Sequence, residues 1–283
     1  MHHLILIPLF FFIISCSNNE TSIEALSVDK INDVLSTSTA AMDFEINAFT
    51  LKQDIAFGNE FADELLKNKK EYPILDSLKN KKLYAYLYSI RSSLLNNSAL
   101  RYKTIFKWKI QIINRNDIIN AFCSPGGHIY VYTGLLKYLK SEAELAGVMA
   151  HEMAHADRRH STRQMTKQLG IELISKYLLK NSYGIAELGG ALLGLRYSRA
   201  YETEADEYSV AYLCNTKYYS AASAKFFYRM LKKKDSEQIQ FMSTHPSHIN
   251  RIYDIKKTKQ DMGCTSLSLF EQEYQNTISK LLK

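Results

Sequence analysis

The chain has 283 residues, of which 46% are hydrophobic, so it can bury one sizeable core and is expected to form one main domain. Its net charge of +7 is accompanied by no nucleic-acid-binding motif, which disfavours that class of partner and leaves solvated lysine-rich faces as the simplest interpretation. Besides Cys16 there are Cys123, Cys214 and Cys264, so at most one internal disulfide can form, and spacing does not choose the pair.

The first residues have the pattern of a lipoprotein signal peptide over 1–15. The apolar run Leu4–Ile14 is far shorter than the roughly twenty residues that a membrane-spanning helix needs. Ile13, Ile14 and Ser15 resemble a bacterial lipobox, which implies cleavage before Cys16 and lipidation of that cysteine. The non-acidic residue that follows resembles lipoproteins sent to the outer membrane. Residues 16–26 are therefore expected to be a lipidated tether on the periplasmic face of that membrane.

Apolar positions recur at loosely helical spacing over 27–75, which predicts an N-terminal segment of one or two helices. Pro73 marks a break near its end. We expect the main domain over 76–262, beginning with a core helix at Lys82–Leu95, and a C-terminal tail or helix over 263–283.

Two β-strands are predicted next. Ile105–Ile113 alternates apolar and polar residues, and His128–Thr133 follows a Pro-Gly-Gly turn. A small sheet with an exposed edge can take up an extended peptide as an added strand. The second strand is the candidate for this role, and its His128 either faces substrate or is an ordinary exposed strand residue. The predicted substrate-binding edge strand comprises Gly127, His128, Ile129 and Tyr130.

A long helix is predicted over Ser141–Arg163. It opens with a capping box, because Ser141 can accept from the third helical N–H while Glu144 reaches back to the Ser141 N–H. A glycine-interrupted apolar stretch around residues 184–194 is too short and too broken to cross a membrane. The further predicted helices are Gln168–Lys180, Tyr197–Tyr212, Ala221–Leu231 and Ile249–Lys259.

The long helix carries an HExxH motif. His151 and His155 lie one turn apart on one face, so two imidazoles can bind one ion from a rigid support. Glu152 is turned about 100° away, where it can act as a base on a water molecule. His160 lies about 140° round from His155, so it is predicted not to be a ligand.

Catalytic zinc typically takes three protein ligands, so a third must come from elsewhere. Glu202 and Asp206 are spaced i, i+4 on the helix Tyr197–Tyr212. Glu202 is a candidate ligand, and Asp206 can accept the free N–H of a ligating histidine and fix its tautomer. The alternative for this helix alone is a solvated acidic face.

Four segments together resemble one family. They are NAFCSPGGHIYVYTGLL at Asn120–Leu136, HEMAH at His151–His155, YSRAYETEAD at Tyr197–Asp206 and STHPSHINRI at Ser243–Ile252. Their order, within about Lys82–Lys257, is similar to that of the HtpX/BepA-like zinc metallopeptidases, a family that also contains the CAAX prenyl proteases. The resemblance implies an α+β, mostly helical fold: a gluzincin-type metallopeptidase domain with a small β-sheet beside the HExxH helix.

The resemblance also implies one zinc ion per chain. In this family the ligands are the two histidines of HExxH and the first Glu of an ExxxD motif. These positions correspond to His151, His155 and Glu202, and the Asp of the second motif corresponds to Asp206.

Two further residues are candidates for gating or for oxyanion stabilisation. His245 precedes a proline in the HPxxxxR pattern that the family shares, and it is interpreted as an inhibitory fourth ligand, an electrophile for the oxyanion, or a structural histidine. Arg199 is the second oxyanion candidate, with a salt bridge inside its acidic helix as the alternative.

These features predict a zinc metalloendopeptidase that cuts unfolded or misassembled proteins of a bacterial cell envelope, with Glu152 activating the attacking water. Its partners would be polypeptide substrates and the membrane reached through the N-terminal lipid. The alternative is an envelope assembly factor or chaperone whose zinc site is gated and rarely active. Intramembrane cleavage of prenylated peptides is disfavoured, because no segment of the sequence is long and apolar enough to span a membrane.

Overall fold

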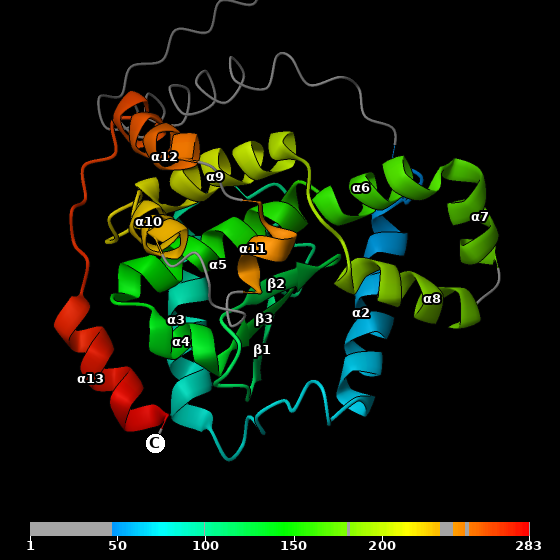
Figure 1. Cartoon of the computed structure of the whole chain (residues 1–283), viewed down its shortest axis with the longest axis horizontal. Helices are drawn as coiled ribbons and strands as arrows, with labels where there is room; N and C mark the ends of the chain where they lie inside the picture. Colours follow the sequence, from blue (N-terminus) through cyan, green and yellow to red (C-terminus); the bar gives the residue numbers. More distant parts are fainter. Residues whose placement is uncertain (1–46, 99, 180–181, 233–239, 247–248, 283) are drawn as a thin grey trace, which may run out of the picture.

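The structure is a computed structural model that describes residues 47–98, 100–179, 182–232, 240–246 and 249–282 (Figure 1). The predicted signal peptide, Cys16, the tether and residues 27–46 of the N-terminal segment lie outside the described residues. What is described is mostly helical with one small sheet, which confirms the predicted α+β class.

The elements have the following bounds in chain order: α2 (Leu51–Lys67), α3 (Lys81–Asn97), β1 (Lys109–Ile113), β2 (Ala121–Ser124), β3 (His128–Tyr132), α4 (Thr133–Tyr138), α5 (Glu142–Asp157), α6 (His160–Leu169), α7 (Ile171–Leu179), α8 (Ser182–Leu193), α9 (Arg199–Cys214), α10 (Ser223–Lys232), α11 (Phe241–Thr244), α12 (Ile249–Asp261) and α13 (Glu271–Leu281).

The sheet has the strand order β1-β3-β2, so β3 is its central strand. β1 pairs with β3 in parallel, and β2 pairs with β3 antiparallel across the turn at Gly126 and Gly127, whose φ angles of 79° and 88° favour glycine. The prediction that Gly127, His128, Ile129 and Tyr130 form an exposed edge is therefore wrong. The short strand β2, which the sequence analysis missed, covers that side and is itself an edge.

Helix α5 lies at the centre of the molecule (Figure 1). Every one of its residues is buried, because α9, α10, α3 and the strand β2 pack around it. The Ser141 hydroxyl accepts from the Glu144 N–H at 3.1 Å as predicted, whereas the Glu144 carboxylate accepts from the Lys140 N–H. Because no face of α5 is exposed to solvent, its polar side chains must find partners inside the core, and the HExxH residues are among them.

The predicted helix Ser141–Arg163 is two helices, because the chain turns at Arg159, whose φ of 60° is left-handed. For any residue other than glycine this conformation is unfavourable in free energy, so surrounding contacts must stabilise it. Arg159 has that support: its guanidinium pairs with the buried Asp54 of α2 and donates to the Phe49 carbonyl at 2.5 Å. The turn places His160 at the first position of α6, directly behind α5.

Helix α2, expected as part of a separate segment, packs into the same body as the main domain. Its phenylalanines Phe57 and Phe61 belong to a second core with Tyr130 of β3 and with residues of α6 and α8. At Gly58 the helix approaches the turn between β2 and β3 so closely that a Cβ there would lie 1.7 Å from the Pro125 carbonyl oxygen. α2 therefore supports the face of the sheet opposite α5.

Other boundaries differ in detail. The strand predicted at Ile105–Ile113 starts only at Lys109, because Trp108 has a left-handed φ of 46° that interrupts the extended chain. The glycine-interrupted stretch forms helix α8, and none of the described helices is long and apolar enough to cross a membrane. Cys214, at the end of α9, forms a disulfide with Cys264, whereas Cys123 is free and buried.

Candidate metal centre

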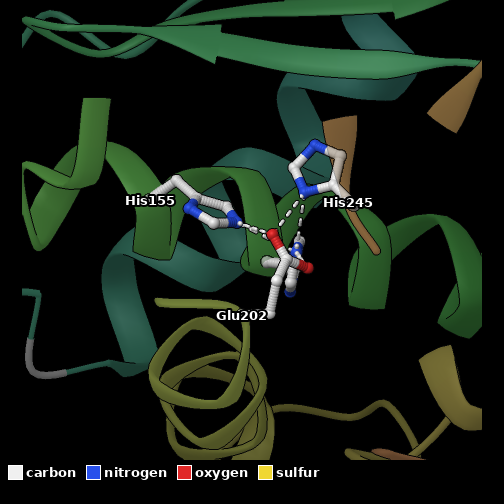
Figure 2. A group of neighbouring side chains, drawn as sticks. His155, Glu202 and His245 are labelled. Carbon is white, nitrogen blue, oxygen red and sulfur yellow. Dashed lines mark hydrogen bonds and ion pairs between the residues drawn. The ribbon is translucent and has the colours of Figure 1, made fainter. Parts of the chain in front are cut away.

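Two buried helices bring the predicted ligands together. α5 supplies His151 and His155, and α9 crosses it with Glu202, so that three side chains from two rigid elements meet in the core. Figure 2 shows the rings of His155 and His245 converging on the carboxylate of Glu202. All of these side chains are 0–1% exposed.

The spacing of the donor atoms fits a tetrahedral metal site. The Nε2 atoms of His151 and His155 are 3.1 Å apart, and they lie 3.5 and 3.4 Å from the two oxygens of Glu202. Nδ1 of His245 is 3.0 Å from Glu202 and 3.4 Å from His151 Nε2. Ligands bound to zinc at 2.0–2.1 Å lie about 3.3 Å apart along the edges of a tetrahedron. His151, His155 and Glu202 therefore have the spacing and the N/O chemistry that such an ion requires, and the donor atom of His245 lies within 4.8 Å of each of them.

His245 also contacts the predicted base. Its second nitrogen, Nε2, lies 3.5 Å from Glu152 Oε1, so that the imidazole stands between Glu152 and the other donors. The ring is held there by stacking on Phe241 with centroids 4.3 Å apart. Neither oxygen of Glu152 has a hydrogen-bond partner among the described residues. A buried carboxylate in that state is poised to bind a proton or a polar ligand.

Asp206 stands behind His151. Its Oδ1 lies 3.0 Å from His151 Nδ1, the ring nitrogen that faces away from the cluster. Arg251 of α12 donates to both oxygens of Asp206, at 2.6 and 2.7 Å, and its Nη1 lies 2.9 Å from Glu202. The same guanidinium reaches the Pro246 carbonyl at 3.4 Å. Arg251 thus balances two buried carboxylates and links them to the loop that carries His245.

The two histidines of α5 differ in proton affinity. Burial lowers the pKa of His151, but the carboxylates of Asp206 and Glu202 outweigh that effect and raise the pKa to about 9. Burial dominates at His155 and holds its pKa well below the ordinary value. His155 is consequently a neutral imidazole, the form in which histidine binds metals.

The two glutamates of the cluster also differ. Burial raises the pKa of Glu202, but the facing His245 and Arg251 outweigh it and hold the pKa well below the ordinary value. At Glu152 burial prevails and raises the pKa. The site therefore combines a firmly ionised carboxylate with one that takes up a proton more readily, which is the division expected between a ligand and a base.

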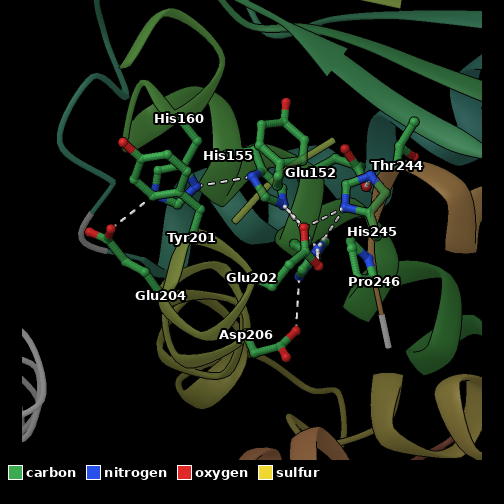
Figure 3. Close-up of polar contacts among 12 residues, drawn as sticks. Glu152, His155, His160, Tyr201, Glu202, Glu204, Asp206, Thr244, His245 and Pro246 are labelled. Atoms are coloured by element: carbon green, nitrogen blue, oxygen red, sulfur yellow. Dashed lines mark hydrogen bonds and ion pairs between the residues drawn. The ribbon is translucent and has the colours of Figure 1, made fainter. Parts of the chain in front are cut away.

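The sequence analysis missed the residues behind His155. Nδ1 of His155 lies 3.0 Å from His160 Nδ1, and the other nitrogen of His160, Nε2, lies 2.9 Å from Glu204 (Figure 3). On the continuous helix that the sequence predicts, His160 would point away from the ion. The helix break at Arg159 brings His160 next to His155. No sequence pattern predicts that an arginine adopts a left-handed backbone conformation.

Two predicted residues are not brought into the cluster. Arg199 is exposed at the first position of α9, so the structure places it outside the buried site. His128 is not an exposed strand residue: it is 3% exposed and contacts Asn59 of α2 at 3.1 Å through Nε2. Burial lowers the pKa of His128 to about 4. His128 is buried because it lies in β3, the central strand of the sheet.

Comparison with known proteins gives a consistent result. The chain is similar to the mitochondrial metalloendopeptidase OMA1 of Arabidopsis thaliana, with 33% identity over 142 residues, which is 50% of this chain and 29% of the relative. It is also similar to OMA1 of Schizosaccharomyces pombe, with 33% identity over 53% of this chain and 46% of the relative. A third relative is the beta-barrel assembly-enhancing protease of Escherichia coli, with 30% identity over 52% of this chain and 34% of the relative.

The chain covers less than half the length of each of these relatives. A family match is more extensive, because it spans residues 81–259, from α3 to α12, and includes all four donors, Glu152, Asp206 and Arg251. This protein therefore belongs to Peptidase family M48, a family of metallopeptidases.

Proposed function

We propose that the chain is a zinc-dependent endopeptidase in which His151, His155 and Glu202 hold the ion. The observation that carries this proposal is the spacing of the buried donor atoms, 3.1–3.5 Å between these three side chains, beside a carboxylate that has no hydrogen-bond partner among the described residues. Two imidazoles and a carboxylate at this spacing inside a buried core form the kind of donor set that holds a zinc ion.

When bound, zinc supplies Lewis-acid chemistry, which polarises a peptide carbonyl and acidifies water. Glu152 then takes the proton of the attacking water and delivers it to the leaving amine. Its buried position favours this role, because a raised pKa brings the carboxylate closer to the pKa of a base that works near neutral pH. Asp206, whose Oδ1 lies 3.0 Å from His151 Nδ1, is placed to orient that ring.

His245 is proposed to close the site as a fourth ligand. Its Nδ1 faces the donors and its Nε2 faces Glu152, which is the space that water and a scissile carbonyl require. The segment that precedes it is anchored by two backbone hydrogen bonds: the Phe241 N–H donates to the Ile119 carbonyl, and the Tyr197 N–H donates to the Thr244 carbonyl. Opening would have to release these contacts before a substrate can enter.

We propose that an extended substrate docks along β2. In an antiparallel pair, only every second residue of a strand forms backbone hydrogen bonds with the partner strand. Asn120 is one of these residues, because its carbonyl accepts from the Tyr132 N–H. The backbone groups of Ala121 and Cys123 therefore point toward the outer edge. Burial, and after it the charge of Glu152, raises the pKa of the Cys123 thiol. This effect of Glu152 supports a position of β2 close to the proposed base. Edge pairing of this kind favours unfolded segments over folded cores.

The proposed substrates are unfolded or misassembled proteins of a bacterial cell envelope. One relative is named a beta-barrel assembly-enhancing protease. The disulfide between Cys214 and Cys264 supports an oxidising compartment, where such bonds persist. The lipobox-like residues before Cys16 support a lipid anchor, which we propose lies on the periplasmic face of the outer membrane.

An assembly factor or chaperone with a rarely active site is the second candidate. The observation that favours it is closure: the donors and Glu152 are 0–1% exposed and His245 fills the space beside the base. In that case the chain would bind unfolded clients chiefly without cutting them.

Degradation of casein, an unfolded protein, by the zinc-loaded purified chain tests the proposal against this candidate. The wild type is expected to cleave, whereas Glu152→Gln, which keeps the shape of the side chain and loses the base, should bind zinc equally and lose activity by at least ~100-fold. Zinc content is measured on both proteins. Cleavage by the variant at the wild-type rate would disprove the role of Glu152, and a zinc-loaded wild type that does not cut would favour the assembly factor.

A further inference from the structure

The two histidines of α5 have different partners at Nδ1, the ring nitrogen that faces away from the donor cluster. His151 has the carboxylate of Asp206 at 3.0 Å from its Nδ1. Among the residues that the structure describes, His155 has no carboxylate paired with its Nδ1, which instead lies 3.0 Å from Nδ1 of His160, itself 0% exposed. Figure 3 shows the resulting line of contacts from Glu204 through His160 and His155 to Glu202. This line runs through the core and ends at the donor cluster.

The chemistry of the line allows one arrangement of protons when His155 binds a metal. Its Nε2 faces the cluster and must present a lone pair, so its proton is on Nδ1. Two facing nitrogens at 3.0 Å require one donor and one acceptor, so His160 Nδ1 accepts and its proton is on Nε2. The Nε2–H then donates to Glu204 Oε2 at 2.9 Å.

Glu204 is fixed in its role as the final acceptor. Its other oxygen, Oε1, accepts from Nε of Arg158 at 2.7 Å, and the guanidinium has only donors to offer. The carboxylate is 1% exposed, and Nη1 of Arg163 lies 3.6 Å from Oε2. Tyr201 stacks on the His160 ring with centroids 4.5 Å apart, which fixes the ring plane. The relay is therefore rigid at each member.

We propose that His160 and Glu204 are positioning residues that hold His155 in the tautomer whose lone pair lies on Nε2, through the chain Glu204–His160–His155. This inference rests on the proposed zinc site, which it extends beyond the ligands. Asp206 serves His151 directly, whereas Glu204 serves His155 through an inserted imidazole. Neither residue is a defined position of the motifs HExxH and ExxxD, since Glu204 fills an unspecified position of the second, and the helix break at Arg159 brings His160 into place.

Substitutions at His160 separate hydrogen bonding from packing. His160→Phe keeps an aromatic ring to stack on Tyr201 but leaves the His155 N–H without an acceptor. His160→Asn places an amide oxygen near the former Nδ1 position and restores that acceptor. Loss of such an outer partner typically costs ~10–100-fold in metal affinity. Zinc affinity, measured by competition with a chromophoric chelator, should fall by this factor for His160→Phe and by clearly less for His160→Asn.

Glu204→Gln makes a sharper test because it keeps the shape of the side chain. Arg158 can only donate, so it should hold the amide oxygen and turn the NH2 group toward His160. His160 Nε2 would then have to accept, which reverses both tautomers and places a proton on His155 Nε2. We expect a loss of zinc affinity similar to that of His160→Phe, together with an altered visible spectrum of the Co2+-substituted protein.

Glu142→Gln is the matched control. Glu142 is a buried carboxylate on the same helix as the ligands, but it accepts from the hydroxyls of Tyr86 and Tyr218 and does not contact the cluster. The zinc affinity of the Glu142→Gln variant should equal that of the wild type. Wild-type affinity in both His160→Phe and Glu204→Gln would overturn the relay while leaving the zinc site intact. A wild type that binds no zinc would overturn both the relay and the proposed function.

Discussion

At the scale of single residues, the proposed role of His245 is to decide whether the site is open. Its Nδ1 faces the donors, 3.0 Å from Glu202, and as a fourth ligand it would exchange this contact for a bond to the ion. A bond worth about as much as a hydrogen bond to a charged group, about 1.5–3 kcal/mol, would lower the open population by a factor of ~10–150. Removing the ring with His245→Ala should therefore raise the rate of casein cleavage by about that factor. Cleavage rates at equal zinc content, measured for both proteins, check the prediction.

His245→Phe is the matched variant for this experiment. It keeps a ring that can stack on Phe241 and fill the space beside Glu152, but it offers no donor atom. If the imidazole closes the site by its volume, this variant should stay slow; if ligation closes it, the variant should be fast. A slower His245→Ala enzyme would contradict the gate and indicate that His245 instead stabilises the oxyanion.

At the scale of elements, the contact between α2 and the turn of β2 and β3 depends on Gly58. A Cβ at this position would lie 1.7 Å from the Pro125 carbonyl oxygen, so helix or hairpin must move. Overpacking of this kind costs about 1–3 kcal/mol, although alanine is the better helix former. We expect Gly58→Ala to lower the free energy of unfolding by that amount, as measured by urea denaturation.

Gly190→Ala is the control for this prediction. Gly190 also lies within a helix, α8, but it is exposed and a Cβ there would meet nothing within 4 Å. The substitution should stabilise the protein by about 0.5–1 kcal/mol, because only the helix propensity changes. If both variants were stabilised, the tight docking of α2 on the hairpin would be wrong.

The elements also indicate how far the sequence could lead. The periodicity and caps of the helices around residues 142–157 and 199–214 are local signals, and they predicted His151 and His155 on one helix face. The meeting of Glu202 with these histidines was implied by the family resemblance, and the structure brings the three side chains together. The strand Ala121–Ser124 is too short to show alternation, so the central position of β3 was missed. The break at Arg159 is supported by Asp54, which is about a hundred residues away in sequence, and no local pattern contains that information.

At the scale of the whole molecule, the site joins parts of the chain that are far apart. α5 supplies two donors, α9 supplies Glu202, and the segment around α11 and α12 supplies His245 and Arg251. The segment 47–67 lies outside the family match yet supports both the sheet and the turn after α5. The folding unit of the peptidase is therefore larger than the region that family resemblance defines.

The disulfide between Cys214 and Cys264 closes a loop of 50 residues that contains α10, His245 and Arg251. Because a cross-link limits the conformations of the unfolded chain, its loss should lower the free energy of unfolding by about 2–4 kcal/mol.

Urea denaturation followed by the fluorescence of the single tryptophan, the buried Trp108, measures this change. The double variant Cys214→Ser, Cys264→Ser should resemble the reduced wild type and should not respond to reductant. Cys123→Ala should respond as the wild type does, because Cys123 is free. An equal response of the double variant and the wild type to reductant would show that this disulfide does not stabilise the fold. The expected response would instead mean that reduction loosens the segment holding His245 and Arg251 against α9, so the stability of the metal centre would depend on the redox state of its compartment.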